Sequence, residues 1–399
     1  MKLKRLTDDF QVEEQISLPH GTGPFAIYKL SKQSLGTLEA IAAIEHKWNL
    51  PRQRIAFAGL KDRHAATSQY ITIQGGPQRG ISQTNLQLDY IGQVERPIHA
   101  SDIVANQFQI VVRDLDDAEA KTTAATLNEI KSDGLPNYFD DQRFGSVGES
   151  GALLAKPWCL GDYERAVWLA LADSNVHDRP LDRDEKTILR QEWGNWQKCV
   201  EQMQPSLRRD VVMHLARQPA DFKRAITVFP HPLRSLWLAA FQSHLWNQTL
   251  SRLIERAVGE SERYLHAIGV SRAPFFSQLE EQQRSRLQQI ALPLPSARLH
   301  LENGELRTLY DEVMAAEGME LRQVRVKYPR DTFFSKGERR AVFQPKDLSH
   351  SFLADDLYAG RQKLVLQFAL PRGSYATILI KRLFGAAEGM EDGDEDGVE

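Results

Sequence analysis

The residues best suited to chemistry lie in one short segment, residues 57–69, with the sequence FAGLKDRHAATSQ. Asp62 stands where an apolar run, residues 55–60, gives way to polar residues, and such junctions often hold reactive groups on a rigid scaffold. Lys61 and Arg63 flank Asp62, and nearby positive charge favours the ionised carboxylate that a nucleophile or a base requires. The same pattern also fits an Asp that caps the next turn or pairs with Arg63 at the surface.

His64 is a second candidate, because an imidazole can act as an acid or a base near neutral pH. The neighbouring sequence offers no obvious Ser or Cys nucleophile for it to activate. Contact with a phosphate, or simple packing, is therefore the expected role of this side chain.

Three further clusters indicate binding rather than bond breaking. Residues 137–145 (NYFDDQRFG) join two aromatic rings to amides and Arg143, which could stack on a base and bond its edge, or could only pack a turn. Asn106 and Phe108 begin a strand, which also fits an ordinary turn-to-strand junction. Residues 370–377 (LPRGSYAT) form a strand-to-helix turn whose amides and Ser374 could hold a phosphate, cap the helix, or both.

Hydrophobic periodicity places these clusters on alternating elements. Strands are predicted over residues 25–30, 55–60, 69–74, 108–112 and 363–368. Helices are predicted from Thr37, as N-cap, to Pro51, over 118–130, and from a Ser374 cap to 384. Between 148 and 321 helical spacing dominates, over residues 152–155, 164–171, 185–203, 206–216, 231–257 and 278–290. An α/β beginning, a helical centre and an α/β end indicate one domain inserted into another.

Composition narrows the classes of protein. The chain has 399 residues, 26% charged and 42% hydrophobic, as expected for about two globular domains. It contains neither an apolar run long enough for a membrane helix nor an N-terminal secretory pattern. Its two cysteines, Cys159 and Cys199, cannot form a disulfide framework and have no metal-type spacing. Without a Walker loop or a Gly-x-Gly-x-x-Gly motif, nucleotide-driven and Rossmann chemistry are not expected.

Charge is unevenly distributed along the chain. The formal net charge is −3, but residues 388–399 (EGMEDGDEDGVE) hold seven acids and no base. Without those seven acids the rest carries +4, which is compatible with a polyanionic partner but does not require one. We expect the acidic stretch, residues 387–399, to be a disordered tail.

Taken together, AGLKDRHAATSQ, NYFDDQRFG and LPRGSYAT resemble the TruD family of tRNA pseudouridine synthases. Supporting segments are DFQVEE (residues 9–14), Asn106-Gln107-Phe108 and FQSHLWN (residues 241–247). Two features depart from the family pattern. Asp140 and Asp141 place two acids in the NYF-x-x-QRFG motif, and residues 259–304 match no familiar bacterial pattern.

The resemblance implies an α+β fold: a pseudouridine synthase catalytic domain, with a mixed, mainly antiparallel sheet and helices, interrupted by an inserted, helix-rich TruD-specific domain. We expect the catalytic domain over residues 1–147 and 326–386, and the insertion over residues 148–325.

The resemblance also assigns residues to roles. It implies that Asp62 is the catalytic aspartate, that Lys4 lies near this carboxylate, and that Asn106 and Phe108 line the base pocket, with Phe108 stacked on the uracil. Candidate contacts to RNA are cations in or near the clusters, together with His64: Lys61, Arg63, Arg143, Arg339, Arg340 and Arg372.

The implied reaction isomerises a uridine, uridine 13 of tRNA, to pseudouridine, with Asp62 attacking C1′ or removing the 2′ proton. We expect no cofactor and no metal, tRNA and other structured RNA as partners, a monomer, and a cytoplasmic location. One rival reading is an inert RNA-binding or RNA-folding protein on the same scaffold. Another, a small-molecule hydrolase, lacks a second acid or a metal cluster at suitable spacing.

Overall fold

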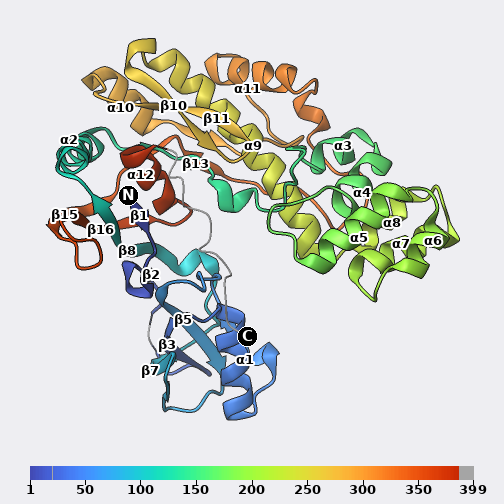
Figure 1. Cartoon of the computed structure of the whole chain (residues 1–399), viewed down its shortest axis with the longest axis horizontal. Coiled ribbons are helices and arrows are strands. Elements are labelled where there is room, and N and C mark those ends of the chain that lie inside the picture. Colours follow the sequence, from blue (N-terminus) through green and yellow to red (C-terminus); the bar gives the residue numbers. More distant parts are fainter. Residues whose placement is uncertain (20, 386–399) are drawn as a thin grey trace. The chain divides into compact units, whose positions relative to one another are not determined.

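A computed structural model describes residues 1–19 and 21–385 (Figure 1). These residues form two compact units: unit 1 contains Met1–Leu135 and the chain from Phe343 onward, and unit 2 is Pro136–Val342. Unit 2 extends beyond the insertion expected over residues 148–325 at both ends. The expected acidic tail, residues 387–399, lies outside the described residues.

Unit 1 is built on a ten-stranded sheet in the order β15-β16-β8-β2-β5-β3-β7-β6, with β1 paired to β8 and β4 to β5. Strands β2 and β5 run parallel, and the other neighbours in this described sheet run antiparallel. The strands are β1 (Lys2–Leu3), β2 (Phe10–Ile16), β3 (Phe25–Gln33), β4 (Ile55–Phe57), β5 (Ala66–Gln74), β6 (Ile81–Gln83), β7 (Leu86–Val94), β8 (Ile103–Leu115), β15 (Lys346–Ala354) and β16 (Gln362–Pro371). The mixed, mainly antiparallel sheet that the sequence analysis expected is confirmed.

Three α-helices of unit 1 accompany this sheet: α1 (Thr37–Trp48), α2 (Asp117–Asp133) and α12 (Ala376–Phe384). Figure 1 shows α1 beside strands β3, β5 and β7, and α2 with α12 beside β8 and β16. Helix α1 buries Ile41 and Ile44 against Tyr28 and Leu30 of β3. Short 3₁₀ turns are η1 (Thr7–Asp9), η2 (Arg52–Arg54) and η3 (Ala100–Asp102).

Two predicted helix caps are wrong. The N-cap of α1 is Gly36, and Thr37 is the first helical residue. The N-cap of α12 is Tyr375 rather than Ser374, because the turn after β16, at residues 372–373, is followed by two residues before the helix begins at Ala376. The Thr37 hydroxyl instead bonds the Lys61 amide and the side chain of Gln69.

Strand register sets which side chains share a face of the sheet. Side chains alternate between the two faces along a strand, so Glu14 of β2 projects to the opposite side from Glu13. Asn106 lies opposite Glu14 in the β2–β8 ladder. Phe368 of β16 lies opposite Phe108 of β8.

Unit 2 is mostly helical and is organised around the long helix α9 (His231–Ala257), which buries Trp237, Phe241, Leu245 and Trp246. The other helices are α3 (Ala155–Leu160), α4 (Tyr163–Leu171), α5 (Pro180–Gln191), α6 (Trp196–Gln202), α7 (Leu207–Arg217), α8 (Phe222–Val228), α10 (Glu281–Gln289) and α11 (Glu305–Ala316), with 3₁₀ turns η4 (Asp141–Arg143), η5 (Glu260–Glu262) and η6 (Leu321–Gln323). Short strands are β10 (Arg263–Ile268), β11 (Ser271–Phe276), β12 (Ala291–Pro293) and β13 (Glu338–Arg340). The chain leaves unit 1 at β9 (Leu135–Pro136) and returns at β14 (Val342–Phe343).

The helical centre contains three departures from prediction. The single helix expected over residues 185–203 is two helices, because Gly194 adopts φ 91° between them. Residues 152–155 are not a helical segment, since α3 begins only at Ala155. The β10–β11 hairpin was missed, and its turn contains Gly269 at φ 59°.

Two findings concern what the described residues lack. None of their helices combines the length and hydrophobicity needed to cross a membrane. Over residues 1–19 and 21–385, no three His, Cys, Asp or Glu side chains are grouped to hold a metal ion.

Candidate active site

Asp62 lies on the loop between β4 and β5, and buried polar side chains of unit 1 fix the backbone of this loop. The Thr37 hydroxyl accepts a hydrogen bond from the Lys61 amide at 2.9 Å and donates one to Gln69 Oε1 at 2.9 Å. Gln69 Nε2 in turn donates to the carbonyl of Gly59 at 3.0 Å. Thr37 and Gln69 are both buried, so the loop approaching Asp62 is held on both sides.

Lys32 of β3 adds a third anchor that sequence reasoning missed. Its side chain is buried, and its ammonium group donates to the carbonyls of Leu35 at 2.6 Å, Lys61 at 3.3 Å and Asp62 at 2.7 Å. Burial lowers the pKa of Lys32 to about 8, against the opposing attraction of the Asp62 charge. A buried lysine satisfied by three carbonyls fixes the backbone at the candidate catalytic residue.

The Asp62 carboxylate is bound by two donors. Lys4 Nζ lies 2.8 Å from Oδ2, and the backbone N–H of His64 donates to Oδ1 at 2.9 Å. Burial acts to raise the pKa of Asp62, but the hydrogen bond and charge of Lys4, with the His64 amide, outweigh it and leave the pKa below its ordinary value. With 24% of its side chain exposed, Asp62 is therefore an ionised carboxylate that remains accessible.

Lys4 reaches Asp62 from an uncommon backbone conformation. Its φ is 49°, in the left-handed region that non-glycine residues seldom occupy and that recurs at functional sites. The same ammonium group lies 4.9 Å from the centre of the Phe10 ring. Lys4 therefore connects the carboxylate to an aromatic cluster.

That aromatic cluster consists of Phe10, Phe108 and Phe368. Phe108 and Phe368 are stacked, with ring centres 5.4 Å apart and 19° between planes, and Phe10 meets Phe108 edge-on at 6.2 Å. Phe108 is buried and Phe10 is half-buried. Because Phe368 covers one face of Phe108, a planar ligand has access only to what remains of that ring and to Phe10.

Lys61 has a role different from the phosphate contact expected of it. Its ammonium group lies 2.6 Å from Asn106 Oδ1 and 3.1 Å from the fully buried carboxylate of Glu14, and its side chain is only 11% exposed. These contacts keep Lys61 away from a surface phosphate and make it the residue that orients Asn106. With Oδ1 occupied, the NH₂ group of Asn106 is the part of the amide left to donate to a ligand.

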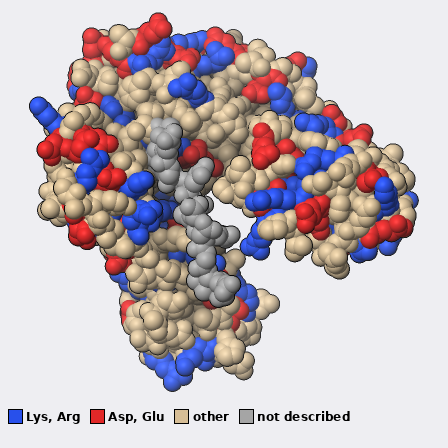
Figure 2. All heavy atoms as spheres, in the orientation of Figure 1, with Lys and Arg blue, Asp and Glu red and all other residues tan. Residues whose placement is uncertain are grey.

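The remaining unit 1 cations named from the sequence are exposed. Arg63 pairs with Glu39 at 3.3 Å rather than with Asp62, so the expected alternative of an Asp62–Arg63 pair is wrong. The side chains of His64 and Arg372 lie at the surface. On the face drawn in Figure 2, Lys and Arg lie among Asp and Glu in both units, so a case for RNA contact rests on individual cations.

The NYFDDQRFG and FQSHLWN segments form part of the core of unit 2. Asn247 clamps the Phe139 backbone, accepting from its N–H at 2.9 Å and donating to its carbonyl at 2.8 Å. Phe139 and Trp246 pack edge-to-face at 5.5 Å, and Tyr138 is fully buried. Residues 137–145 thus pack a turn, as one of the two alternatives predicted. Because they belong to the core of unit 2, this unit begins before residue 148.

Three cations expected to touch RNA belong to this part of unit 2. Arg339 lies 4.3 Å from the Phe139 ring centre and donates to the Asn137 carbonyl at 2.7 Å. Arg143 approaches the same ring at 5.5 Å, and Arg340 is exposed. Arg339 is thus engaged in packing, whereas Arg340 is the most accessible of the three.

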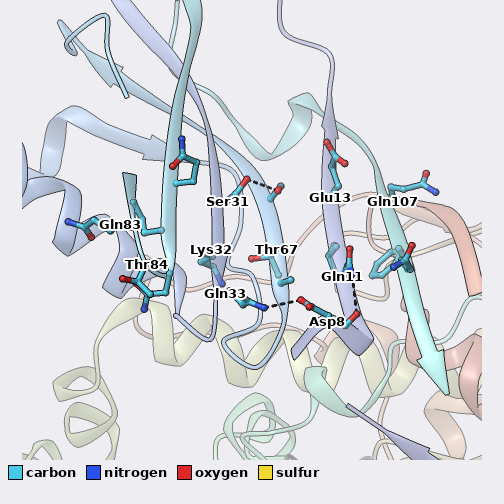
Figure 3. Close-up of a pocket in the computed structure, with 18 of the residues that line it drawn as sticks. Asp8, Gln11, Glu13, Ser31, Lys32, Gln33, Thr67, Gln83, Thr84 and Gln107 are labelled. Atoms are coloured by element: carbon cyan, nitrogen blue, oxygen red, sulfur yellow. Dashed lines mark hydrogen bonds between the residues drawn. The ribbon is translucent and has the colours of Figure 1, made fainter. Parts of the chain in front are cut away.

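A polar hollow of about 520 Å³ lies over the middle of the unit 1 sheet (Figure 3). Side chains around it include Gln11, Glu13 and Gln107, with Gln33 bonded to Asp8. By strand alternation these odd-numbered β2 and β8 side chains face away from the side chains of Glu14 and Asn106. Phe108 and Lys32 also line the hollow, whereas Asp62, Lys4, Glu14 and Asn106 are not among its lining residues.

Comparison with known proteins decides the family. Residues 1–383 match the family described as tRNA pseudouridine synthase D (TruD). The chain belongs to the TruD family. It is 30% identical over 397 residues to a Methanococcus maripaludis protein named probable tRNA pseudouridine synthase D 1, covering 96% of this chain and 99% of that one. A Leptospira interrogans protein named tRNA pseudouridine synthase D is 31% identical, covering 96% and 95% of the two chains.

A solved structure supports the fold as well. The crystal structure of a Methanosarcina mazei protein described as a TruD aligns with a TM-score of 0.73 and 24% identity, covering 96% of this chain and 93% of that one. The family and the fold class inferred from the sequence are thus confirmed.

The structure adds residues to the site that the motifs did not mark. Phe10 appeared only as part of a supporting segment, Thr37 was named only as a helix cap, and Lys32 and Phe368 were not singled out. Phe368 could have been found from its place two residues before LPRGSYAT, on a strand that pairs with the Phe108 strand. Lys32 offered one weak signal, a charge in an otherwise half-buried strand.

Proposed function

We propose that this protein is a tRNA pseudouridine synthase that isomerises uridine 13 of tRNA, with Asp62 as the catalytic carboxylate. The observation that carries the proposal is the accessible, ionised Asp62, bound by Lys4 and connected through it to an aromatic cluster. Membership of the TruD family supports tRNA as the substrate. We further propose that the protein acts in the cytoplasm as a monomer.

The reaction exchanges one glycosidic bond for another. The N1–C1′ bond breaks, the uracil turns, and C5 joins C1′; the proton on C5 is then lost and N1 regains one, so the product is an isomer. Asp62 serves this sequence as nucleophile at C1′ or as base at the 2′ proton, and both roles require the ionised form that Lys4 favours. After C5–C1′ bond formation, Asp62 acting through water is our candidate for removing the C5 proton.

The base pocket follows from the neighbours of Asp62. A uridine must leave its stack to react, and aromatic stacking offsets part of that cost. Phe108, with Phe10 at its edge, supplies aromatic surface for the uracil. The NH₂ group of Asn106, oriented by Lys61, suits a uracil carbonyl, which can only accept a hydrogen bond.

RNA outside the pocket needs contacts to phosphate. We propose Arg63, His64 and Arg372 for this role in unit 1, since their side chains are exposed, and Arg143 for a contact in unit 2. Each such contact releases counterions, so tRNA affinity is expected to fall steeply as salt rises.

The test uses a tRNA transcript carrying tritium at uracil C5. Wild-type protein should release tritium, and chemical mapping should place the single new pseudouridine at position 13. A transcript with cytidine at position 13 should release nothing from that site. Release that persists with this transcript would reject the position while keeping the reaction, and no release from either transcript would reject the function.

The rival function, an RNA-binding or RNA-folding protein without catalysis, predicts a different result. In that case the protein binds and refolds tRNA equally well as wild type and as Asp62→Asn, and no pseudouridine forms. The Lys4–Asp62 geometry favours catalysis, because RNA binding alone does not require an accessible, ionised carboxylate beside a base pocket.

A further inference from the structure

The segment of unit 2 between η6 and β13 has a bend and turn over residues 328–331 and contains neither helix nor strand. We call residues 325–336 the basic strap. The indole N–H of Trp158 donates to the carbonyl of Tyr328 at 3.0 Å. The guanidinium of Arg234, a buried residue, binds both oxygens of Asp331 at 2.9 Å. The strap therefore has no regular secondary structure but is firmly attached.

The attachment forces one aromatic ring outward. Thr332 and Phe334 are buried, and the carbonyl of Ser335 accepts a hydrogen bond from Gln242 at 2.9 Å. Burial alternates along residues 332–334, and Phe333, between two buried neighbours, projects away from the core and is 72% exposed. This is the highest exposure among the large exposed hydrophobic side chains of the described residues, shared with Val176.

Cations surround this ring along the strap. Arg325, Lys327, Arg330 and Lys336 are all exposed, and within residues 1–19 and 21–385 none forms an ion pair with a carboxylate. The acid of the strap, Asp331, is already held by Arg234. The surface thus combines one displayed aromatic ring with several uncompensated positive charges.

We propose that the basic strap binds a single-stranded stretch of the substrate RNA, with Phe333 stacked on an unpaired base and Arg330 and Lys336 on the flanking phosphates. Three residues span at most about 11 Å even when fully extended, so both long cationic side chains can reach the backbone beside a base on Phe333. Aromatic stacking combined with positive charge is how proteins bind single strands without reading sequence. The proposal rests on the proposed function for the identity of the RNA.

The charge of the strap favours RNA over a protein partner. Protein interfaces are depleted of charge in their buried centre, and Lys is depleted across them, whereas here the exposed ring is flanked by four cations. A protein partner is therefore an outcome of the test rather than a second proposal.

The first experiment measures the dissociation constant for an unmodified tRNA transcript. Phe333→Ala should weaken binding between about 5- and 150-fold, the range that loss of one base stack produces, and Phe333→Trp should restore it. Leu181→Ala, which removes a side chain 70% exposed in the same unit, should leave binding unchanged. Unchanged affinity for Phe333→Ala overturns the proposal, and so does rescue by Phe333→Leu equal to that by Phe333→Trp.

The second experiment measures salt dependence. Arg330→Gln combined with Lys336→Gln should reduce the slope of log affinity against log salt by about 1.4, since each phosphate contact on a single strand contributes about 0.7. Arg322→Gln, an exposed arginine paired with Glu320, is the matched control and should not change the slope. An unaltered slope in the double variant overturns the proposal.

Catalysis separates this proposal from the proposed function. With saturating tRNA, Phe333→Ala should release tritium at the wild-type maximal rate while its KM rises. If wild type itself releases no tritium, the proposed function is wrong. The tRNA affinities of wild type and Phe333→Ala then still test the proposal for the strap. If tRNA binding is unaffected by Phe333→Ala but another protein loses affinity, the surface serves a protein and the strap proposal is wrong.

Discussion

The loop around Asp62 in unit 1 and the residues 137–145 segment in unit 2 look alike as sequence but differ in what their polar groups do. Around Asp62 a carboxylate bound by Lys4 stays accessible. Around Phe139 the polar groups are consumed by packing, since both amide functions of Asn247 close on one backbone. A distinctive motif therefore does not by itself separate chemistry from folding.

What distinguishes a chemical role from a folding role is whether the polar groups are buried and whether packing contacts use all of their hydrogen bonds. Lys32, Thr37 and Gln69 fix the backbone of the Asp62 loop, and the carboxylate itself bonds the His64 amide of the loop with Oδ1 and Lys4 with Oδ2. Residues 137–145 of unit 2 need no such supporting side chains, because they are themselves part of the core. Variants in the two regions should accordingly fail in different ways.

The largest expected effect is on folding, in unit 2. Asn247→Ala leaves the N–H and carbonyl of Phe139 buried without partners, which should lower the free energy of unfolding by about 3–5 kcal/mol. Urea denaturation measures this loss. Gln248→Ala, on the next residue of the same helix and half-buried, is the control. Equal stability of the two variants would contradict a structural role for the clamp.

The second effect is on catalysis, in unit 1. Lys32→Met frees the carbonyls of Lys61 and Asp62, and the resulting misplacement of the carboxylate should lower kcat by about 10²-fold with little change in KM. Tritium-release kinetics measure both constants. Lys29→Met, on the same strand but paired with Glu13 on the other side, should retain activity. A rise in KM alone would mean that Lys32 supports binding rather than the position of Asp62.

The third effect is on the pH profile. Asp62 has a depressed pKa, so wild-type activity should be lost only as pH falls below the ordinary aspartate range, when the carboxylate is protonated. Lys4→Met leaves burial to raise the pKa of Asp62, which should move this acid limb to higher pH. The profile of kcat/KM measures the shift, with Lys2→Met as the control. An acid limb that stays in place would separate Lys4 from the ionisation of Asp62.

The smallest effect concerns phosphate contacts. Arg372→Gln should weaken tRNA binding by about 3- to 10-fold and lower the salt slope by about 0.7–0.9. Arg63→Gln should do less, because its charge is already shared with Glu39 at 3.3 Å. Fluorescence anisotropy at several salt concentrations measures both, and a larger effect at Arg63 would reverse the assignment.

Much of the fold could be predicted because periodicity and caps reflect local physics. Helix α9 was predicted over the residues that form it, and strands β3, β5, β8 and β16 were found in part, each longer in the structure than its alternating run. The break at Gly194 was missed because the apolar spacing around it fits one longer helix. The β10–β11 hairpin was missed because its apolar spacing gave no clear pattern; in both places a glycine at positive φ makes the turn.

Sequence motifs identified individual residues of the candidate site but not how those residues are arranged in space. Asp62 and Asn106 lie in marked segments, but their arrangement depends on pairing between distant strands. That Lys61 turns to Glu14 and Asn106 follows from the ladder register, which puts Glu14 opposite Asn106. Lys32 could not be assigned, since a single charged residue in a strand is most often solvated and only the fold shows the three carbonyls around it.

The most direct measurement compares wild type and Asp62→Asn in single-turnover tritium release with tRNA bound at saturation. The variant keeps the shape of the side chain and loses only its charge and basicity, and Asp89→Asn, at an exposed position of β7, provides the matched control. We predict that Asp62→Asn binds tRNA as tightly as wild type and releases tritium at least about 10³-fold more slowly. Release by Asp62→Asn at the wild-type rate would contradict the account.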